Sequence, residues 1–321
     1  MLHDKLAGVI GALLVSLSPT VVQSQVLNVT LLGTGGPEPA IDRFGPSVLV
    51  EAGPEKLLVD AGRGTTQRLW QLGVRLGDVN ALFLTHLHSD HTVGIPDLWL
   101  TGWLRTRFGR RNSPLSVWGP KGSEAMMAAL KKAYEEDIRQ RTEGSALPAE
   151  GIALDVHDVG EGVVYQRNGV KVTAFNVDHG AVPMLALGYR IDYAGRSVII
   201  SGDTRPSENL IRFATGADVV VHEVMAADSA LSQPAEAVRR VLASHTSPEE
   251  AGRVFDRVKP KLAVYTHIGL VTDPSRSGVL LAALIPRTRT SYSGPLEIGE
   301  DLMTIGIGDT VAVHRVGAAA R

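Results

Sequence analysis

The sequence predicts an α/β protein in which strands and helices pack in layers. From Val26 onward, short runs rich in β-branched residues alternate with helical stretches. Several of these runs are uninterrupted apolar segments closed by a polar residue, a pattern typical of strands covered on both faces. The 321-residue sequence contains no repeat, low-complexity stretch or linker, and it is long enough to bury a substantial core. We therefore expect residues 25–321 to form one domain.

The expected elements follow one another along the whole chain. Apolar runs predict strands at Val26–Leu32, Ser47–Glu51, Lys56–Asp60, Ala81–Thr85, Leu115–Trp118, Val170–Asn176, Leu187–Asp192, Ser197–Ser201, Val219–Glu223 and Leu262–Thr266. Helices are predicted at Gly64–Leu72, Ser123–Arg141, Pro206–Phe213, Gln233–Leu242 and Ser247–Val258. The last of these opens with a serine, a proline and two glutamates, which is a favourable start for a helix.

The composition restricts the chemistry. Lys and Arg total 32 and Asp and Glu total 34, so the net charge is −2. A chain with this charge is not suited as a whole to binding polyanions. There is no cysteine, which excludes disulfides, a thiol nucleophile, iron–sulfur clusters and zinc sites built on thiolates. Any bound metal must be held by carboxylates and by some of the ten histidines.

The first 24 residues have the pattern of a secretory signal peptide. Lys5 precedes the apolar run Leu6–Leu17, which is too short to span a bilayer. Pro19 follows, and Val22 and Ser24 occupy the −3 and −1 positions of a cleavage site. A buried N-terminal helix is the alternative, and the glycines and proline in this segment disfavour it. We expect a periplasmic or secreted protein without a membrane span.

The segment Thr85–His91 concentrates potential metal ligands where a predicted strand ends. Three imidazoles and one carboxylate, of His86, His88, Asp90 and His91, cannot all face one way on a strand or a helix. A loop can fold them around a point, and these donor types suit zinc. A solvated polar loop is the competing interpretation. We favour a metal site, because four potential ligands in six residues are rare.

Further polar residues directly follow other predicted strands. They are Asp60, His179, Asp203 and His267. In α/β sheets this is the position at which functional sites lie. We therefore expect these side chains to complete the site that the histidine-rich loop begins.

At this point the sequence resembles the metallo-β-lactamase superfamily. The motif Thr-His-Leu-His-Ser-Asp-His, followed by a single His, a single Asp and a final His, is similar to the dinuclear metal signature of that superfamily. The resemblance runs from about Leu27 to Gly269 and implies an αββα sandwich of two mixed sheets.

The same resemblance implies a role for each of these side chains. One zinc ion would be bound by His86, His88 and His179, the other by Asp90, His91 and His267, and both would be bridged by Asp203. Asp60 would accept hydrogen bonds from the ligand loop and hold the imidazoles in orientation. Two zinc ions about 3.5–4 Å apart would supply a bridging hydroxide as nucleophile. Asp90 would orient this hydroxide and pass a proton to the leaving group.

Other segments are similar to tRNA 3′-processing endonucleases of the ribonuclease Z type. They are Leu32–Gly35 with Arg43, Ser201–Pro206, Val221–Glu223 and His245–Ser247. In that family a histidine donates to a phosphate oxygen and a glutamate orients it, roles that His245 and Glu223 would take here. Structural roles are also open: His222 would then be a core residue, and His245 would merely precede a helix.

The chain also departs from ribonuclease Z. Those enzymes carry a protruding tRNA-binding arm between the third and fourth metal motifs, whereas only 24 positions separate His179 from Asp203 here. The sequence is thus similar to arm-less, exported relatives with promiscuous phosphodiester and β-lactam hydrolysis. The four arginines of Arg105–Arg111 are open to two interpretations, phosphate contacts or a solvated loop.

We therefore expect a dinuclear zinc hydrolase that acts on a small-molecule or nucleic-acid phosphodiester. A periplasmic metallo-β-lactamase is the first alternative, although dedicated lactamases usually replace the bridging aspartate that Asp203 would supply. An arylsulfatase or a lactonase of the same fold is the second. A non-enzymatic metal-binding protein is disfavoured, because the ligand set is complete. A homodimer is expected by analogy alone.

Overall fold

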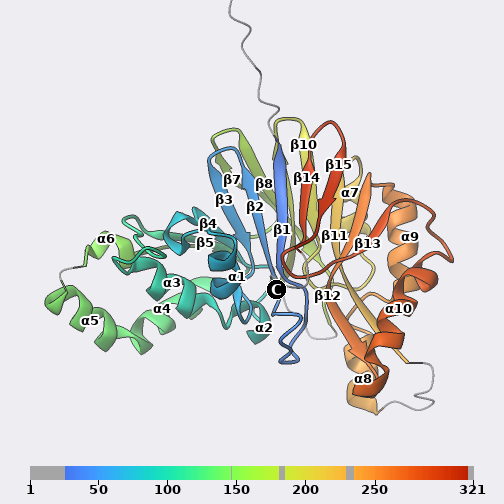
Figure 1. Cartoon of the computed structure of the whole chain (residues 1–321), viewed down its shortest axis with the longest axis horizontal. Coiled ribbons are helices and arrows are strands. Elements are labelled where there is room, and N and C mark those ends of the chain that lie inside the picture. Colours follow the sequence, from blue (N-terminus) through green and yellow to red (C-terminus); the bar gives the residue numbers. More distant parts are fainter. Residues whose placement is uncertain (1–25, 146, 181–184, 229–234, 317–321) are drawn as a thin grey trace, which may run out of the picture.

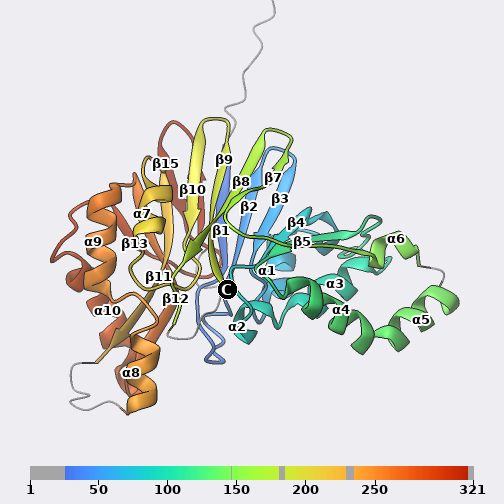
Figure 2. The same cartoon turned by 180° about the vertical axis from the view of Figure 1, so that it is seen from behind.

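The computed structural model describes residues 26–145, 147–180, 185–228 and 235–316, so the expected signal peptide lies outside the described residues. Two β-sheets pack face to face, and helices cover the outer face of each (Figures 1 and 2). This αββα arrangement confirms the fold class expected from the sequence. Among the described residues, no helix combines the length and the apolar character needed to cross a membrane.

The first sheet, within the described residues, has eight strands in the order β15-β14-β1-β2-β3-β4-β5-β6. Their bounds are β1 (Leu27–Gly33), β2 (Ser47–Ala52), β3 (Glu55–Val59), β4 (Ala81–Phe83), β5 (Leu115–Gly119), β6 (Leu154–Asp158), β14 (Thr304–Ile307) and β15 (Val311–His314). The strands from β3 to β6 run parallel, and the strands from β15 to β3 alternate in direction.

The second sheet, over the same described ranges, has the strand order β13-β12-β11-β10-β9-β8-β7. Its strands are β7 (Gly162–Arg167), β8 (Val170–Val177), β9 (Ala186–Tyr193), β10 (Arg196–Ile200), β11 (Val219–Ala227), β12 (Leu262–Val271) and β13 (Leu296–Ile298). The strands from β10 to β13 run parallel, so their carboxyl ends lie along one edge of the sheet.

The helices form the two outer layers. Their bounds are α1 (Thr65–Gln71), α2 (Ser89–Thr92), α3 (Ile95–Trp103), α4 (Ser123–Ala133), α5 (Glu135–Gly144), α6 (Ala149–Ile152), α7 (Glu208–Ala214), α8 (Glu236–Leu242), α9 (Pro248–Val258) and α10 (Ser277–Thr288), with short 3₁₀ turns at Leu76–Asp78 and Pro274–Arg276. Apolar side chains of α1, α3 and α4 pack on the first sheet, and those of α7, α9 and α10 pack on the second. The start of α9 is fixed by a capping box between Ser247 and Glu250, as its sequence predicted.

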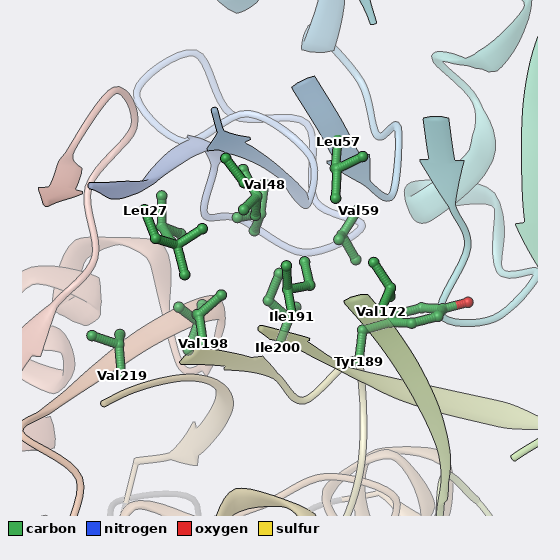
Figure 3. Packing of buried hydrophobic residues seen from close by; sticks show 14 of the residues in the cluster. Leu27, Val48, Leu57, Val59, Val172, Tyr189, Ile191, Val198, Ile200 and Val219 are labelled. Atoms are coloured by element: carbon green, nitrogen blue, oxygen red, sulfur yellow. The ribbon is translucent and has the colours of Figure 1, made fainter. Parts of the chain in front are cut away.

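The inner core lies between the two sheets (Figure 3). Val48 and Val59 from the first sheet face Ile191, Val198 and Ile200 from the second, and all five are at most 4% exposed. Full burial of an aliphatic side chain of this size contributes about 1.5–3 kcal/mol. This core holds the two sheets in fixed relation and thereby fixes the strand ends that carry the site.

Two features of the helical layer differ from the expectation. The predicted helix Ser123–Arg141 is two helices, because the backbone leaves the helical region at Tyr134 (φ −103°, ψ 13°). The two helices also differ in burial: α4 buries Ser123 and Met127, whereas α5 buries none of its residues fully and only its Ile138 packs on the same apolar cluster. The helices α6 and α10 were not predicted, and α10 carries Pro286 inside its last turns.

Candidate metal centre

The histidine-rich loop connects β4 to the single helical turn α2, which begins at Ser89. His88 precedes this turn in an extended conformation (φ −63°, ψ 148°). The turn then places Asp90 and His91 on the inner side of the loop, where both are buried. His86 is completely buried. A short strand followed by a tight turn thus brings the four side chains close together, two into each of the two ligand groups described below.

Asp60 anchors this loop from the end of β3. Its Oδ1 accepts a hydrogen bond from the backbone N–H of Thr85, and its Oδ2 accepts from the Thr85 hydroxyl and from Nδ1 of His91, all at 2.8 Å. Nδ1 of His86 lies 3.0 Å from the same hydroxyl. Because a carboxylate oxygen accepts this bond, Nδ1 of His91 carries a proton, and Nε2 is the nitrogen that a metal can bind.

His267 reaches the cluster through a β-bulge. In the pairing of β11 with β12, Glu223 lies opposite Thr266 and Val224 lies opposite Ile268, so His267 is an extra residue in the strand. Its backbone adopts φ +42°, a left-handed conformation that is costly for a side chain other than glycine. A bulge turns a side chain away from its regular direction. Here it turns the imidazole toward the histidine-rich loop.

Asp203 and His179 come from two further strand ends. Asp203 follows Gly202, whose φ is +61° and at which a Cβ would lie 2.7 Å from the carbonyl oxygen of Leu187. Glycine is therefore required for the turn that presents Asp203. His179 follows β8 and pairs its Nδ1 with the carbonyl oxygen of Ser244 at 3.0 Å. That bond leaves Nε2 of His179 directed into the cluster.

The seven side chains form two groups joined at a carboxylate. Ligand atoms within 4.8 Å of one another define one group of His86, His88, His179 and Asp203 and another of Asp90, His91 and His267. Oδ2 of Asp203 lies between them, 3.2 Å from Nε2 of His267, 3.4 Å from Nε2 of His91 and 3.8 Å from Nε2 of both His86 and His179. A carboxylate shared by two sets of imidazoles is suited to bridging two cations.

The electrostatics of the cluster favour cation binding. Burial and neighbouring imidazoles hold the pKa of His86 well below its usual range, so this ring is neutral. The pKa of Asp203 also lies well below its usual range: burial opposes this, but the charges of His267 and His91 outweigh it. Burial lowers the pKa of His91, but Asp203 and Asp60 raise it well above the ordinary value overall. A metal ion that binds here would therefore displace a proton.

A histidine–glutamate pair, His245 with Glu223, adjoins the cluster. Oε1 of Glu223 accepts hydrogen bonds from the backbone N–H groups of Thr204 and Thr246 and lies 3.0 Å from Nδ1 of His245. The His245 ring lies 4.9 Å from the ring of His179, between centroids. Burial lowers the pKa of His245, but the charge of Glu223 and its hydrogen bond raise it above the usual value overall. The pairing expected from the sequence is thus present.

The remaining expectations have mixed outcomes. His222 is a core residue, fully buried and packed edge-to-face on Phe255. In the arginine-rich segment, Arg105, Arg107 and Arg110 are exposed. Arg111 is instead buried and donates to the backbone carbonyls of residues 76, 98 and 99, so its guanidinium supports the fold.

Sequence reasoning missed the residues that fix the Thr34 loop beside the cluster. Asp301 accepts from both the backbone and the hydroxyl of Thr34, and it forms a buried ion pair with Arg68 at 2.9 Å. The carbonyl of Thr34 in turn accepts from the N–H of Ile268, next to the bulge. No motif marks Asp301, because its partners lie more than 200 positions away in the sequence.

Comparison with known proteins agrees with this geometry. Residues 48–268 match the family model described as Beta-lactamase superfamily domain. Ribonuclease Z of Mycobacterium bovis (strain BCG / Pasteur 1173P2) is 36% identical over 282 residues, covering 88% of this chain and 99% of that protein. Ribonuclease Z of Mycobacterium sp. (strain KMS) is 35% identical over 292 residues, covering 91% of this chain and all of that protein.

Solved structures share the fold at lower sequence identity. The metallo-β-lactamase fold protein YhfI from Bacillus subtilis superposes with a TM-score of 0.67 at 20% identity, covering 88% of this chain and all of that one. The short form of human tRNase Z superposes with a TM-score of 0.64 at 21% identity, covering 87% of this chain and 98% of that one. The chain therefore belongs to the β-lactamase superfamily and, within it, to the metal-dependent hydrolases that resemble ribonuclease Z.

Proposed function

We propose that this chain is a dinuclear zinc hydrolase that cleaves phosphodiesters. The observation that carries the proposal is the His245–Glu223 pair beside the two ligand groups. A protonated imidazole next to a metal pair is placed to donate to a phosphoryl oxygen, a task that hydrolysis of a β-lactam does not require. The similarity to ribonuclease Z supports the same substrate class and makes RNA the first nucleic acid to test.

The donor set, which is buried except for His88, fits zinc. Imidazole nitrogens and carboxylate oxygens are its usual ligands in the absence of thiolates. Nε2 of His91 is buried without a hydrogen-bond partner among the described residues, and Oδ2 of Asp203 lies within 3.8 Å of four imidazole nitrogens. One ion would be held by His86, His88 and His179 and the other by Asp90, His91 and His267, with Asp203 shared. When bound, such a pair lowers the pKa of a bridging water and supplies hydroxide as the nucleophile.

The side chains of this chain then have distinct tasks. Asp60 keeps His91 in the tautomer that binds a metal. Asp90, which lies 3.3 Å from Nε2 of His267, orients the nucleophile and passes its proton toward the leaving group. His245 donates to a phosphoryl oxygen, and Glu223 holds the imidazole and stabilises its protonated form.

The test is a substrate panel on zinc-replete protein, with the bound metal measured by elemental analysis. We expect two zinc ions per chain and turnover of bis(p-nitrophenyl) phosphate and of an RNA with a 3′ extension. His245→Ala should lower phosphodiester turnover by about 10²–10⁴-fold without loss of zinc. His314→Ala, at an exposed position of β15, is the matched control and should change nothing.

Three results would overturn the proposal. Efficient nitrocefin hydrolysis with negligible phosphodiester turnover would identify a β-lactamase instead. Preference for a lactone or an aryl sulfate would identify a lactonase or an arylsulfatase of the same fold. Phosphodiester turnover that survives His245→Ala would remove the observation on which the assignment depends.

We also propose that the protein is exported, with residues 1–24 as its signal peptide and residues 25–321 as the hydrolase domain. The supporting observation is the basic, apolar and small-residue pattern of the sequence. Expression of the full chain should yield a periplasmic or secreted protein whose N-terminal residue is Gln25. An intact N-terminus in the cytoplasmic fraction would refute export. Light scattering on the same sample tests the homodimer expected by analogy.

A further inference from the structure

A small cavity lies between the two sheets, directly behind the metal centre. Its walls include Val48, Val59 and Ile200 from the inner core and Asp203, Glu223, Thr266 and His267 from the site. The centre of a water molecule can occupy about 20 Å³ of it. About 10–15 Å³ measured in this way is enough to hold one water. The cavity therefore has room for one water molecule.

Besides Nε2 of His91, which faces the ligand cluster, four polar atoms on cavity-lining residues have no hydrogen-bond partner among the described residues. They are Oδ1 of Asp203, Oε2 of Glu223, Oγ1 of Thr266 and Nδ1 of His267. Each of the four residues is at most 7% exposed. Leaving one buried polar atom unpaired costs about 1–3 kcal/mol, and native proteins rarely contain several such atoms in one place.

The strand pairing explains why these atoms gather. Glu223 and Thr266 lie opposite each other on the parallel strands β11 and β12. Each lies two positions after a residue of the inner core, Val221 or Val264, so both side chains point between the sheets. Glu223 and Thr266 therefore present their free oxygens to the same space.

Asp203 and His267 line the cavity and also belong to the ligand cluster. Oδ2 of Asp203 and Nε2 of His267 lie 3.2 Å apart within the ligand cluster. The remaining polar atoms, Oδ1 of Asp203 and Nδ1 of His267, are the second oxygen of the carboxylate and the second nitrogen of the imidazole. A metal-binding imidazole almost always donates its second N–H to a carboxylate, a carbonyl or a water. The other candidate ligands His91 and His179 have such a partner for Nδ1 in Asp60 and the Ser244 carbonyl.

We propose that one ordered water molecule occupies this cavity and that Thr266 is the positioning residue that holds it. Nδ1–H of His267 and the hydroxyl of Thr266 donate to the water, and the water donates to Oε2 of Glu223 and Oδ1 of Asp203. Two donors and two acceptors match the four hydrogen bonds that water can make. The water joins the His245–Glu223 pair to two ligands of the metal centre and keeps Nε2 of His267 free to bind metal.

The first test is a crystal structure of the zinc-loaded protein at a resolution that places ordered water. We expect a single density peak within hydrogen-bonding distance of all four atoms. A dry cavity, or a direct hydrogen bond from Thr266 to Glu223 that closes it, would overturn the inference.

The second test measures zinc affinity by competition with a chelator, in the absence of substrate. Thr266→Val keeps the shape of the side chain and removes its hydroxyl, and it should weaken zinc binding about 10–100-fold, the effect usual for a partner of a ligand. Thr266→Ser restores the hydroxyl and should restore most of the affinity. Thr30→Val removes a buried hydroxyl from β1, outside the walls of the cavity, and should leave zinc binding unchanged.

The inference rests on the proposed function only in treating His267 and Asp203 as zinc ligands. Both tests are read without substrate, so a β-lactamase or a sulfatase would give the same outcome as a phosphodiesterase. Unchanged zinc affinity in a folded Thr266→Val variant would refute the positioning role even if phosphodiester turnover is found. If that variant does not fold, the electron density of the wild-type cavity decides.

Discussion

Asp203 and Asp301 are both 2% exposed, yet the two carboxylates have opposite surroundings. Asp301 is fully paired: its Oδ1 accepts from the N–H and the hydroxyl of Thr34, and its Oδ2 accepts from Phe44 N–H and Arg68. Asp203 has Oδ2 among four imidazoles and Oδ1 without a partner among the described residues. A carboxylate that the protein satisfies by itself holds the fold together. One that it buries and leaves unsatisfied is prepared for a ligand.

The sharpest test of this contrast is Asp203→Asn. The amide cannot neutralise two cations, so we expect turnover of the zinc-loaded enzyme to fall at least about 10³-fold, or about 4 kcal/mol of transition-state stabilisation. The metal-free variant should lose less stability than Asp301→Asn does, because Asp60 still pairs with His91 when the charge of Asp203 is gone. Steady-state kinetics and urea unfolding without metal measure the two effects. A metal-free variant that is several kcal/mol less stable would place Asp203 in the same class as Asp301.

Asp301→Asn should produce the reverse pattern. It leaves the Arg68 guanidinium buried without its counter-charge, and breaking a buried pair in this way costs about 3–5 kcal/mol. Zinc affinity of the folded fraction should stay close to that of the wild type. Urea unfolding and chelator competition measure these quantities, with Asp309→Asn as the control in an exposed pair with Arg196, where the cost is about 0–1 kcal/mol. Zinc binding that is lost before stability is lost would contradict a purely structural role.

Asp218 is a third carboxylate in this comparison, paired with Lys261 and with the backbone N–H of Ser197. Its replacement should show the smallest effect. Burial raises its pKa, but hydrogen bonds from Lys261 and Ser197 lower it below the usual value overall. Asp218→Asn should cost about 1 kcal/mol at neutral pH. The wild-type advantage should be complete above the ordinary aspartate pKa of about 3.9 and should shrink as the pH falls through the lower pKa of the folded state. Urea unfolding across this range measures the difference, and a gap that does not change with pH would exclude the ionised carboxylate as its source.

The sequence predicted the parts of the fold that a continuous local pattern of residues marks. Strands β10, β11 and β12 each contain an uninterrupted apolar run, because both faces are covered there, and a residue of the site lies two or three positions after each run. Strands β6, β14 and β15 escaped prediction, since their residues are partly exposed and form no such run. The break between α4 and α5 at Tyr134 was also missed, because no glycine or proline stands there to indicate it.

The candidate site divides in the same way. The ligands could be predicted because each comes soon after an apolar run in the sequence, and motif order then indicated their grouping. The bulge at His267 could not be predicted, since it exists only in the pairing of β11 with β12. Asp301 and Thr266 were missed for a related reason. Each acts on groups that the fold brings together from distant segments, and neither carries a local pattern.

The spacing of the ligands along the chain has a consequence for the unfolded state. His86, His179 and His267 are separated by 93 and 88 positions and come from both sheets, so a metal cluster that binds all three closes two long loops. Such closure reduces the entropy of the unfolded chain in proportion to the logarithm of loop length. A cysteine-free protein has no disulfide with which to do this. In an extracellular setting, bound zinc would act as a removable cross-link, and a chelator would expose the chain to proteases as well as stop its chemistry.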